Sequence, residues 1–295
     1  MMEYQIILDV GGTGIKGLLH RFGASASDFH EYPAQADADR SVLIRHFCSI
    51  CDELLVASGD CEPVCTTLSL AFPGPFDYER GIPLMHGLNK YESIYGVCLP
   101  EVFLEYWQAN GNHCYDKARW NFLNDVSAFA LGAIDRYSLH GRTMCVCLGT
   151  GTGSAFCING KLCTNIEEGI PENGWIYPIP FEGAIIDEVL SARGISRLSE
   201  RYCQTSKTPL QLFNEATLGN EQALAVWEQY GHLLLKGLTP FAEAFNADTL
   251  VLGGKIALAS RFFLNTMEQW CSNRDIRLLI ETDTSEIVIR GLMNV

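Results

Sequence analysis

The chain has 295 residues, about two domains at a typical ~150 residues each, and 47% of them are apolar, which is enough for two hydrophobic cores. A formal net charge of −14 without any Lys/Arg-rich run argues against nucleic acid as a partner, because a phosphate backbone would be repelled. No window approaches the ~18 uninterrupted apolar residues of a membrane-spanning helix, and the N-terminus lacks the basic start of a secretory signal. We therefore expect a cytoplasmic globular protein without a membrane partner.

The twelve cysteines are expected to be reduced thiols, because cytoplasmic proteins rarely keep disulfides. Four of them, Cys48, Cys51, Cys61 and Cys65, have a spacing that faintly resembles a zinc site. However, the first two lie in a helical apolar pattern and Cys65 begins an apolar strand, positions where cysteine packs as a small hydrophobe. We expect hydrophobic packing there.

The first half of the chain opens with an apolar run, residues 4–19, which four glycines interrupt, and this pattern indicates strand, glycine turn, strand. A helix is expected over 41–58 and a strand over 66–71. This strand runs into residues 72–77, which we call the Pro-Gly-Pro loop. The segment 115–122 leads to Asn124 and Asp125, where an Ala-rich helix over 126–136 begins, so Asp125 should lie at a helix N-terminus.

The second half of the chain begins in a similar way. A strand over 143–148 meets a second glycine turn, residues 149–153, and continues as a strand over 154–158, with Asn159 and Gly160 as a hairpin signal. A long helix is expected over 221–246, and a strand over 249–252 ends at Gly253 and Gly254. Because strands alternate with helices, the sequence predicts the α/β class.

The two glycine turns have matching surroundings. When residues 12–14 are aligned with residues 151–153, both read Gly-Thr-Gly, and the apolar segment 6–8 falls on 145–147. This repeat predicts two lobes that each open with strand, turn, strand. We place the lobe boundary near residue 118, so that the lobes are residues 1–118 and 119–295.

The first glycine turn, residues 11–14, is suited to phosphate, because glycines let the backbone approach a ligand and direct successive N–H groups toward one point. Thr13 could add a hydroxyl and Lys16 a charge, while Asp9 could orient a hydrated Mg²⁺. A tight hairpin that binds nothing is the alternative for one such turn alone. Gly253 and Gly254 offer a surface suited to an adenosine, with a helix or strand cap as the alternative.

Residues 12–17 also match the G-x-G-x-x-G fingerprint of dinucleotide-binding folds, with Asp37 and Asp39 roughly where a ribose-binding carboxylate is expected. That fingerprint requires a helix to begin inside the motif, whereas residues 15–20 are short, contain glycine and are typical of a strand. A nicotinamide-dependent oxidoreductase rests on this match alone. The strict Walker pattern of P-loop proteins is absent.

Phosphoryl transfer to a hydroxyl needs positioning, charge stabilisation and one group that accepts the hydroxyl proton. Asp125 is the candidate for this base, and neighbouring Asn124 offers both a donor and an acceptor to a polyol. The alternative is that the two residues form an ordinary helix N-cap, a role that can coexist with catalysis.

Together these segments resemble the ROK family of bacterial sugar kinases and repressors, within the actin, Hsp70 and hexokinase fold group. Residues 9–16 resemble the family's first phosphate loop, and the Pro-Gly-Pro loop with Gly81 resembles its sugar-side loop. Residues 124–136 are similar to its catalytic segment, residues 148–161 to its second phosphate loop, and residues 251–254 to its adenosine end. The resemblance spans nearly the whole chain in the expected order.

The resemblance implies a two-lobed actin/hexokinase-like (ribonuclease H-like) α/β fold, with a mixed sheet flanked by helices in each lobe and a last helix that returns to the N-terminal lobe. It also implies a dimeric, glucokinase-like or N-acetylhexosamine kinase that uses ATP and Mg²⁺ to phosphorylate a hexose hydroxyl, with Asp125 as the catalytic base. The residues implied to bind the sugar are Gly74, Asn89, Asn124, Asp125, Glu172 and Asp187. Those implied to bind the nucleotide are Asp9, Gly11, Gly12, Thr13, Gly14, Lys16, Gly149, Thr150, Gly151, Thr152, Gly153, Gly253 and Gly254.

The chain departs from the family pattern where most members carry a zinc motif. The family's Glu-x-Gly-His is represented by residues 172–175, with Trp175 in place of the histidine, and no cysteine occurs over 164–202, so no zinc site is expected. Asp187 is a loose match to the glutamate that follows the family's zinc cysteines. The family's Asn-Leu pair on the sugar side is reversed here as Leu88-Asn89.

A second hypothesis keeps the fold without the catalysis, as a sugar-sensing or regulatory member of the same family. Family repressors carry a DNA-binding segment before the first phosphate loop, whereas only eight residues precede Asp9 and the chain is acidic. Sensing through protein contacts is the form of this hypothesis that stays open. The kinase hypothesis depends on the two glycine turns meeting around one triphosphate that is aimed at Asp125.

Overall fold

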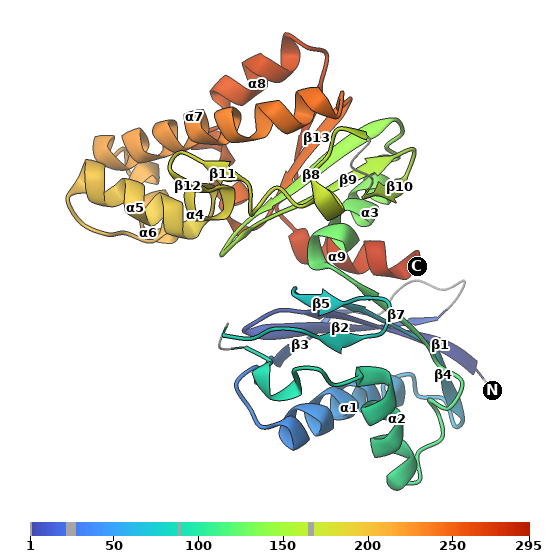
Figure 1. The fold of residues 1–295 in the computed structure, drawn as a ribbon. Helices are drawn as coiled ribbons and strands as arrows, with labels where there is room; N and C mark the ends of the chain where they lie inside the picture. The colour runs from blue at the N-terminus through green and yellow to red at the C-terminus, as the bar shows by residue number, and fades with distance from the viewer. Residues whose placement is uncertain (1, 22–27, 88–89, 165–167) are drawn as a thin grey trace. The chain divides into compact units, whose positions relative to one another are not determined.

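The structure is a computed structural model, and it describes residues 2–21, 28–87, 90–164 and 168–295 (Figure 1). The chain forms two compact units. The first contains Met1–Gly132 and Ser285–Val295, and the second contains Ala133–Thr284. Each unit is built on a five-stranded mixed sheet. The α/β class with one mixed sheet per lobe, which the sequence predicts, is confirmed.

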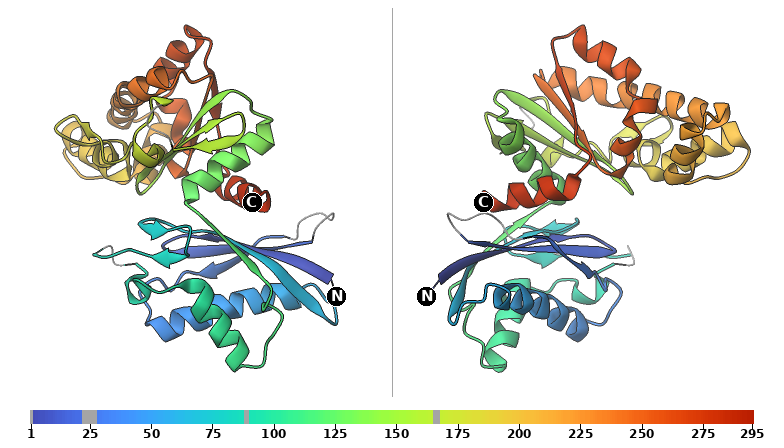
Figure 2. Two further views of the ribbon diagram at one scale, coloured as in Figure 1. Left: turned by 45° about the vertical axis from the view of Figure 1, so that its right-hand side comes forward. Right: turned by 180° about the vertical axis from the view of Figure 1, so that it is seen from behind.

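The sheet of the first unit has the strand order β3-β2-β1-β4-β7. Its strands are β1 (Met2–Val10), β2 (Gly14–Arg21), β3 (His30–Pro33), β4 (Pro63–Ala71) and β7 (Arg119–Leu123). β1 and β2 form an antiparallel hairpin closed by the first glycine turn, while β4 runs parallel to β1 and β7 runs parallel to β4. One face is covered by α1 (Arg40–Val56) and α2 (Leu99–Ala109), as both views of Figure 2 show, and a short hairpin of β5 (Phe76–Asp77) and β6 (Ile82–Pro83) follows β4.

The sheet of the second unit repeats this arrangement in the order β10-β9-β8-β13-β14. Its strands are β8 (Arg142–Leu148), β9 (Thr152–Ile158), β10 (Lys161–Cys163), β13 (Thr249–Gly253) and β14 (Arg277–Ile280). β8 and β9 form the antiparallel hairpin around the second glycine turn, and β13 runs parallel to β8. The strand, turn, strand repeat predicted from the two Gly-Thr-Gly segments is therefore confirmed, and a strand in place of a helix after Gly14 removes the basis for a dinucleotide-binding fold.

The remaining elements of the second unit follow β10. They are a 3₁₀ helix (Glu172–Gly174), a short hairpin of β11 (Pro180–Phe181) and β12 (Ala184–Ile185), the helices α4 (Ile186–Leu190), α5 (Ala192–Cys203), α6 (Pro209–Thr217), α7 (Glu221–Ala244) and α8 (Asn265–Ser272), and a 3₁₀ helix (Lys255–Phe262). Among these helices, α5 and α6 pack against α7. A further 3₁₀ helix, Glu92–Ile94, belongs to the first unit. Among the helices in the described ranges, none is both long enough and apolar enough to cross a membrane.

The first unit extends beyond the boundary near residue 118 that we expect from the sequence. β7 pairs with β4 through the register Leu70 to Phe122, so the strand belongs to the first sheet, and the unit continues into α3 (Asp125–Tyr137) as far as Gly132. The sequence signal of β7 is weak because the strand has only five residues and Phe122 is the only one that is fully buried.

Most of the last helix, α9 (Thr284–Met293), also belongs to the first unit. The buried Gln5 side chain on β1 anchors it, because its amide donates to the Leu292 carbonyl and to the Ser69 hydroxyl, both at 3.0 Å. At the other end of the chain, the Val295 carbonyl accepts a hydrogen bond from Asn121 at 3.0 Å. The chain therefore passes between the units twice, at residues 132–133 within α3 and at residues 284–285.

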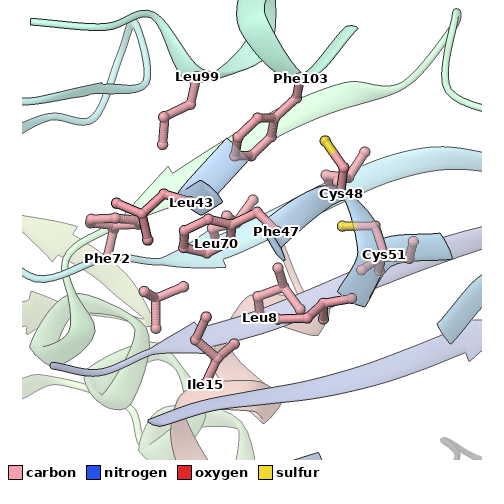
Figure 3. Close-up of a cluster of buried hydrophobic side chains, with 14 of the residues drawn as sticks. Leu8, Ile15, Leu43, Phe47, Cys48, Cys51, Leu70, Phe72, Leu99 and Phe103 are labelled. Atoms are coloured by element: carbon pink, nitrogen blue, oxygen red, sulfur yellow. The ribbon is translucent and has the colours of Figure 1, made fainter. Parts of the chain in front are cut away.

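The hydrophobic core of the first unit lies between the sheet and the helices α1 and α2. Figure 3 shows side chains of β1, β2 and β4 packed against Phe47 of α1 and Phe103 of α2. Cys48 and Cys51 lie within this cluster, and burial raises the pKa of both thiols, while that of buried Cys65 is raised to about 12. These cysteines therefore pack as small apolar side chains.

The contact between α3 and α9 depends on two glycines. A Cβ atom at Gly132 would lie 1.8 Å from the Ile287 carbonyl oxygen, and one at Gly291 would lie 1.9 Å from the Ala128 carbonyl oxygen. Because backbone atoms of both helices occupy this space, any larger residue must push the helices apart. The two segments that connect the units are thus held together by direct backbone packing.

We expect Gly291→Ala to destabilise the protein by about 2 kcal/mol or more, because added volume in a rigid contact forces backbone shifts. Chemical unfolding monitored by circular dichroism measures this loss. Gly12→Ala is the control, since its Cβ would approach nothing closer than Lys90 Cδ at 3.6 Å. Equal stability of the two variants would contradict the close approach of α3 and α9.

Candidate functional site

The conformation of the first glycine turn is fixed by hydrogen bonds to its backbone. The Gly11 N–H donates to the Gly14 carbonyl at 2.9 Å, and a Cβ at Gly11 would lie 2.9 Å from the same oxygen, so the turn needs glycine there. The Thr13 carbonyl accepts the Ala34 N–H at 3.2 Å, and the phenol of Tyr91 donates to the Gly11 carbonyl at 2.7 Å. Tyr91 is fully buried, which makes it a rigid support for the turn.

Asp9 ends β1 immediately before this turn and is paired in register with Lys16 on β2. Burial and the negative charge of Asp125 raise the pKa of Asp9 to about 6, while a hydrogen bond from Ser285 and the charge of Lys16 act in the opposite direction. Lys16 also forms an ion pair with Glu31 at 3.6 Å. The fold therefore brings Asp9 and Asp125 close enough to repel each other, although they are far apart in sequence.

Asn124 and Asp125 form the N-terminus of α3. The Val126 N–H donates to Asn124 Oδ1 at 3.0 Å and to Asp125 Oδ1 at 2.9 Å, and the Ala128 N–H donates to the Asn124 carbonyl at 2.9 Å. Burial raises the pKa of Asp125, whereas its backbone hydrogen bonds and the positive charge of Lys90 lower it. Asn124 and Asp125 thus form the helix N-cap that is the alternative to catalysis. The hydrogen bond from the Val126 N–H uses Oδ1 of Asp125 and not Oδ2.

The Pro-Gly-Pro loop lies beside Asn124. The Asn124 amide donates to the Tyr78 hydroxyl at 3.1 Å, and this hydroxyl donates to the Phe72 carbonyl at 3.0 Å. A Cβ at Gly74 would lie 3.3 Å from the Tyr78 hydroxyl and 4.0 Å from the Asn124 amide nitrogen. Because Oδ1 caps α3 and the amide nitrogen binds Tyr78, the Asn124 side chain is fixed at both ends.

The second glycine turn lies in the second unit and is tied to the segment that follows β12. The Gly149 N–H donates to the Gly151 carbonyl at 2.9 Å, and the Gly149 carbonyl accepts the Ala192 N–H at 2.9 Å. The Thr152 N–H donates to Asp187 Oδ1 at 2.7 Å. Asp187, which the resemblance implies as a sugar ligand, therefore contacts this turn.

Gly253 and Gly254 end β13, next to the start of the second glycine turn. A Cβ at Gly254 would lie 2.2 Å from the Leu148 carbonyl oxygen, and Gly254 has a φ of +90°, so both packing and conformation require glycine. The Gly254 N–H donates to the Thr284 hydroxyl at 2.8 Å. This packing accounts for Gly254 as a strand cap, and it also brings the expected adenosine end beside the expected phosphate turn.

The other expected sugar ligands lie apart from these contacts or outside the described residues. Glu172 is exposed in the 3₁₀ helix Glu172–Gly174, which the Ser154 hydroxyl holds by donating to the Gly174 carbonyl at 2.6 Å. Trp175, at the position of the family's histidine, packs against Tyr177 with ring centroids 6.0 Å apart. Asn89 lies outside the described residues.

The structure thus brings the expected residues together in two groups. Around Asp125 in the first unit are Asp9, Asn124, Gly74 and the first glycine turn, and around the second glycine turn in the second unit are Asp187 and Gly254. Whether the two turns meet around one ligand stays a prediction. Among the described residues, no three His, Cys, Asp or Glu side chains are arranged to hold a metal ion.

Sequence reasoning missed four residues that support these groups, namely Tyr78, Lys90, Tyr91 and Ser285. Tyr78 and Tyr91 act through single hydroxyl groups on backbone or amide partners, which no spacing pattern reveals. Ser285 begins the part of α9 that returns to the first unit, so its contact with Asp9 depends on that return. Lys90 lies near both Gly12 and Asp125, which is 35 residues away in sequence, so no local pattern marks this contact.

We expect Asp9→Asn to stabilise the folded protein at pH 8. The pKa of Asp9 is raised from 3.8 to about 6, so the folded state holds its proton more tightly, and the ionised form costs roughly 3 kcal/mol above pH 6. This gain should disappear as the pH falls from 6 toward 4. Thermal unfolding across this range measures it, with Asp37→Asn, an exposed carboxylate, as the control. An unchanged melting temperature at pH 8 would contradict the raised pKa of Asp9.

The chain is similar to known sugar kinases in sequence and in fold. It is 25% identical to a glucokinase of Halalkalibacterium halodurans over 90% of this chain and 84% of the relative. It is also 28% identical to an N-acetyl-D-glucosamine kinase of Salmonella paratyphi B, over 45% of this chain and 50% of the relative. A ROK family glucokinase from Streptomyces griseus, solved in complex with glucose and AMPPNP, superposes with a TM-score of 0.71 at 15% identity over 99% of this chain and 98% of that one, which shows the shared fold.

The family assignment rests on the segment from β7 into α3 and on the whole second unit. Residues 117–291, more than half of the chain, match the ROK family. This range contains Asn124, Asp125 and the second glycine turn, and the two-sheet fold agrees with the match. The chain therefore belongs to the ROK family.

Proposed function

We propose that this protein is a sugar kinase that transfers the γ-phosphoryl group of ATP to a hydroxyl of a hexose, with Mg²⁺. The observation that carries the proposal is the pair of like-charged carboxylates, Asp9 and Asp125, beside a glycine turn in the first unit. Glucose is the first acceptor to test and N-acetylglucosamine the second, because the relatives described above include a glucokinase and an N-acetyl-D-glucosamine kinase.

The carboxylate pair fits a magnesium-assisted reaction. Two partly buried acids that repel each other cost free energy, and a hydrated Mg²⁺ bound through Asp9 would reduce that cost. When bound, the ion would neutralise charge on the phosphates. The acidic net charge of the chain makes such a local cation necessary for an anionic nucleotide to bind.

Asp125 is suited to accept the proton of the sugar hydroxyl. Its capping contacts with the Val126 N–H fix the carboxylate at the start of α3, and the fixed Asn124 amide beside it can bind a neighbouring hydroxyl. Burial raises the pKa of Asp125, which strengthens the carboxylate as a base. Proton acceptance and sugar positioning would thus come from adjacent residues.

The second unit would supply the other half of the nucleotide site. Its glycine turn and Gly254 are in contact through Leu148, an arrangement that suits phosphates and an adenosine side by side. We propose that the two units close on ATP and sugar together, which would exclude water and suppress hydrolysis of ATP. A homodimer and a cytoplasmic location, both expected from the sequence, remain part of this proposal.

We expect Asp125→Asn to lower kcat by about three orders of magnitude, because the amide removes the proton acceptor while keeping its volume. ADP release with a panel of hexoses measures turnover, and calorimetry measures sugar binding, which should persist. Asp135→Asn, an exposed carboxylate on the same helix, is the control. Equal turnover of Asp125→Asn and the native protein would remove Asp125 from the mechanism. Sugar binding by the native protein without any ADP release would favour the sensor hypothesis.

As the pH is lowered, we expect kcat/KM to decline at a higher pH than it would if the two carboxylates had ordinary pKa values. Asp9 must be ionised to bind a cation and Asp125 must be ionised to accept a proton, and both pKa values are raised. The value of kcat/KM should therefore decline as the pH drops through about 6. An acid limb that begins only below pH 4.5 would contradict the raised pKa values of the two acids.

Tyr78→Phe should raise the KM for the sugar by roughly fivefold and leave kcat nearly unchanged, because it releases the Asn124 amide from a fixed orientation without touching the base. Initial-rate kinetics with both substrates varied measures this effect. Tyr95→Phe, at an exposed tyrosine of the same unit, is the matched control. An unchanged sugar KM in Tyr78→Phe would mean that Asn124 does not position the sugar.

A further inference from the structure

The carboxylate of Asp187 is already bound at both oxygens within the second unit. Oδ1 accepts the Thr152 N–H at 2.7 Å, and Oδ2 forms an ion pair with Arg193. The side chain is only 17% exposed. Both of its partners belong to the second glycine turn or to the helix beside that turn, which leaves little of the carboxylate for a sugar hydroxyl.

The segment from Asp187 to Arg193 holds the turn from two sides. Asp187 binds the N–H at the end of the turn, and the Ala192 N–H binds the Gly149 carbonyl at its start, at 2.9 Å. A Cβ at Gly151 would lie 3.0 Å from Asp187 Oδ1, so the carboxylate packs directly on the turn backbone. The conformation of the turn therefore depends on this segment.

A carboxylate this close to a phosphate-binding turn would repel the ligand unless its charge were balanced. Arg193 supplies that balance, and its guanidinium group carries five N–H donors in a planar fork. The side chain of Arg193 is 60% exposed, so donors that do not bind Asp187 are available to an incoming anion. The hydroxyls of Thr152 and Ser191 are also buried here and have no hydrogen-bond partner among the described residues. Buried hydroxyls normally have a partner, so these two are unsatisfied hydrogen-bonding groups beside the turn.

We propose that Asp187 and Arg193 belong to the nucleotide site and not to the sugar site. Asp187 is a positioning residue that orients the second glycine turn and Arg193, and Arg193 binds the polyphosphate of ATP. The proposal rests on the proposed kinase function and changes the role of Asp187 that the family resemblance implies. An aspartate is one methylene shorter than the family's glutamate, which keeps its carboxylate against the turn.

The test is initial-rate kinetics with ATP and glucose both varied, for Asp187→Ala, Asp187→Asn and Arg193→Ala. We expect Asp187→Ala and Arg193→Ala each to raise the KM for ATP about tenfold, the effect of losing one charge-assisted hydrogen bond, while the sugar KM changes less than twofold. Asp187→Asn should be milder, because its amide oxygen can still accept the Thr152 N–H. The double variant should lose less than the product of the two single effects, because the residues act as a pair.

A neighbouring ion pair provides the matched control. Glu188 and Arg197 connect the same two helices at 3.5 Å, with side chains 42% and 59% exposed, and neither has a hydrogen bond to the turn in the described structure. Glu188→Ala and Arg197→Ala should leave the KM for ATP unchanged. Thermal unfolding of each variant confirms that it is folded, and calorimetry with Mg·ADP in the absence of sugar gives a readout that needs no turnover.

Three results would overturn the inference. A tenfold rise of the sugar KM in Asp187→Ala with an unchanged KM for ATP would show that Asp187 belongs to the sugar site. Unchanged Mg·ADP affinity in both Asp187→Ala and Arg193→Ala would remove the pair from the nucleotide site. A native protein that binds neither nucleotide nor sugar would overturn the proposed kinase function itself, and the inference with it.

Discussion

The burial of two neighbouring carboxylates, Asp9 and Asp125, is the constraint on which the site depends. The fold places two carboxylates from the end of β1 and the start of α3 within reach of each other, and burial raises the pKa of both. Such an arrangement costs stability, which hydrogen bonds to the carboxylates and nearby positive charge offset. Lys16 and Lys90 supply part of that charge, and a metal ion bound with a nucleotide would supply the rest. The pair therefore has a physical reason to bind a cation, and a residue that can act as base is already next to it.

The supports around this pair come from parts of the chain that are distant in sequence. Ser285 of α9 donates a hydrogen bond to Asp9, Tyr91 fixes the first glycine turn, and Tyr78 fixes Asn124. α9 reaches this place because glycines at 132 and 291 let its backbone pack against α3. Thr284, the residue before Ser285, accepts the Gly254 N–H in the second unit. Thr284 thus contacts Gly254 in the second unit, and Ser285 contacts Asp9 in the first unit. The two residues are adjacent at one of the two places where the chain passes from one unit to the other.

Much of this organisation could be predicted from the sequence. The two Gly-Thr-Gly turns after apolar strands predict the paired hairpins, and alternating strands and helices predict the fold class, because both signals are local. The place of β7 in the first sheet could not be predicted, since β7 is short and half exposed and joins that sheet only through pairing with β4. The contacts of Asp187 were equally inaccessible. Its position suggests a family sugar ligand, whereas its hydrogen bond to Thr152 depends on how the β8–β9 hairpin and α4 pack. Residues such as Tyr78 and Ser285 act through one hydroxyl each, and no periodicity marks them.

The central claim is that the two glycine turns bind one nucleotide opposite Asp125. A crystal structure of the protein with Mg²⁺, AMPPNP and glucose tests this claim most directly. We expect phosphate oxygens in contact with backbone N–H groups of residues 11–14 and of residues 149–153, the metal ion beside Asp9, and a glucose hydroxyl within hydrogen-bond distance of the Asp125 carboxylate. A nucleotide that contacts only one of the two turns, or a sugar bound away from Asp125, would contradict it.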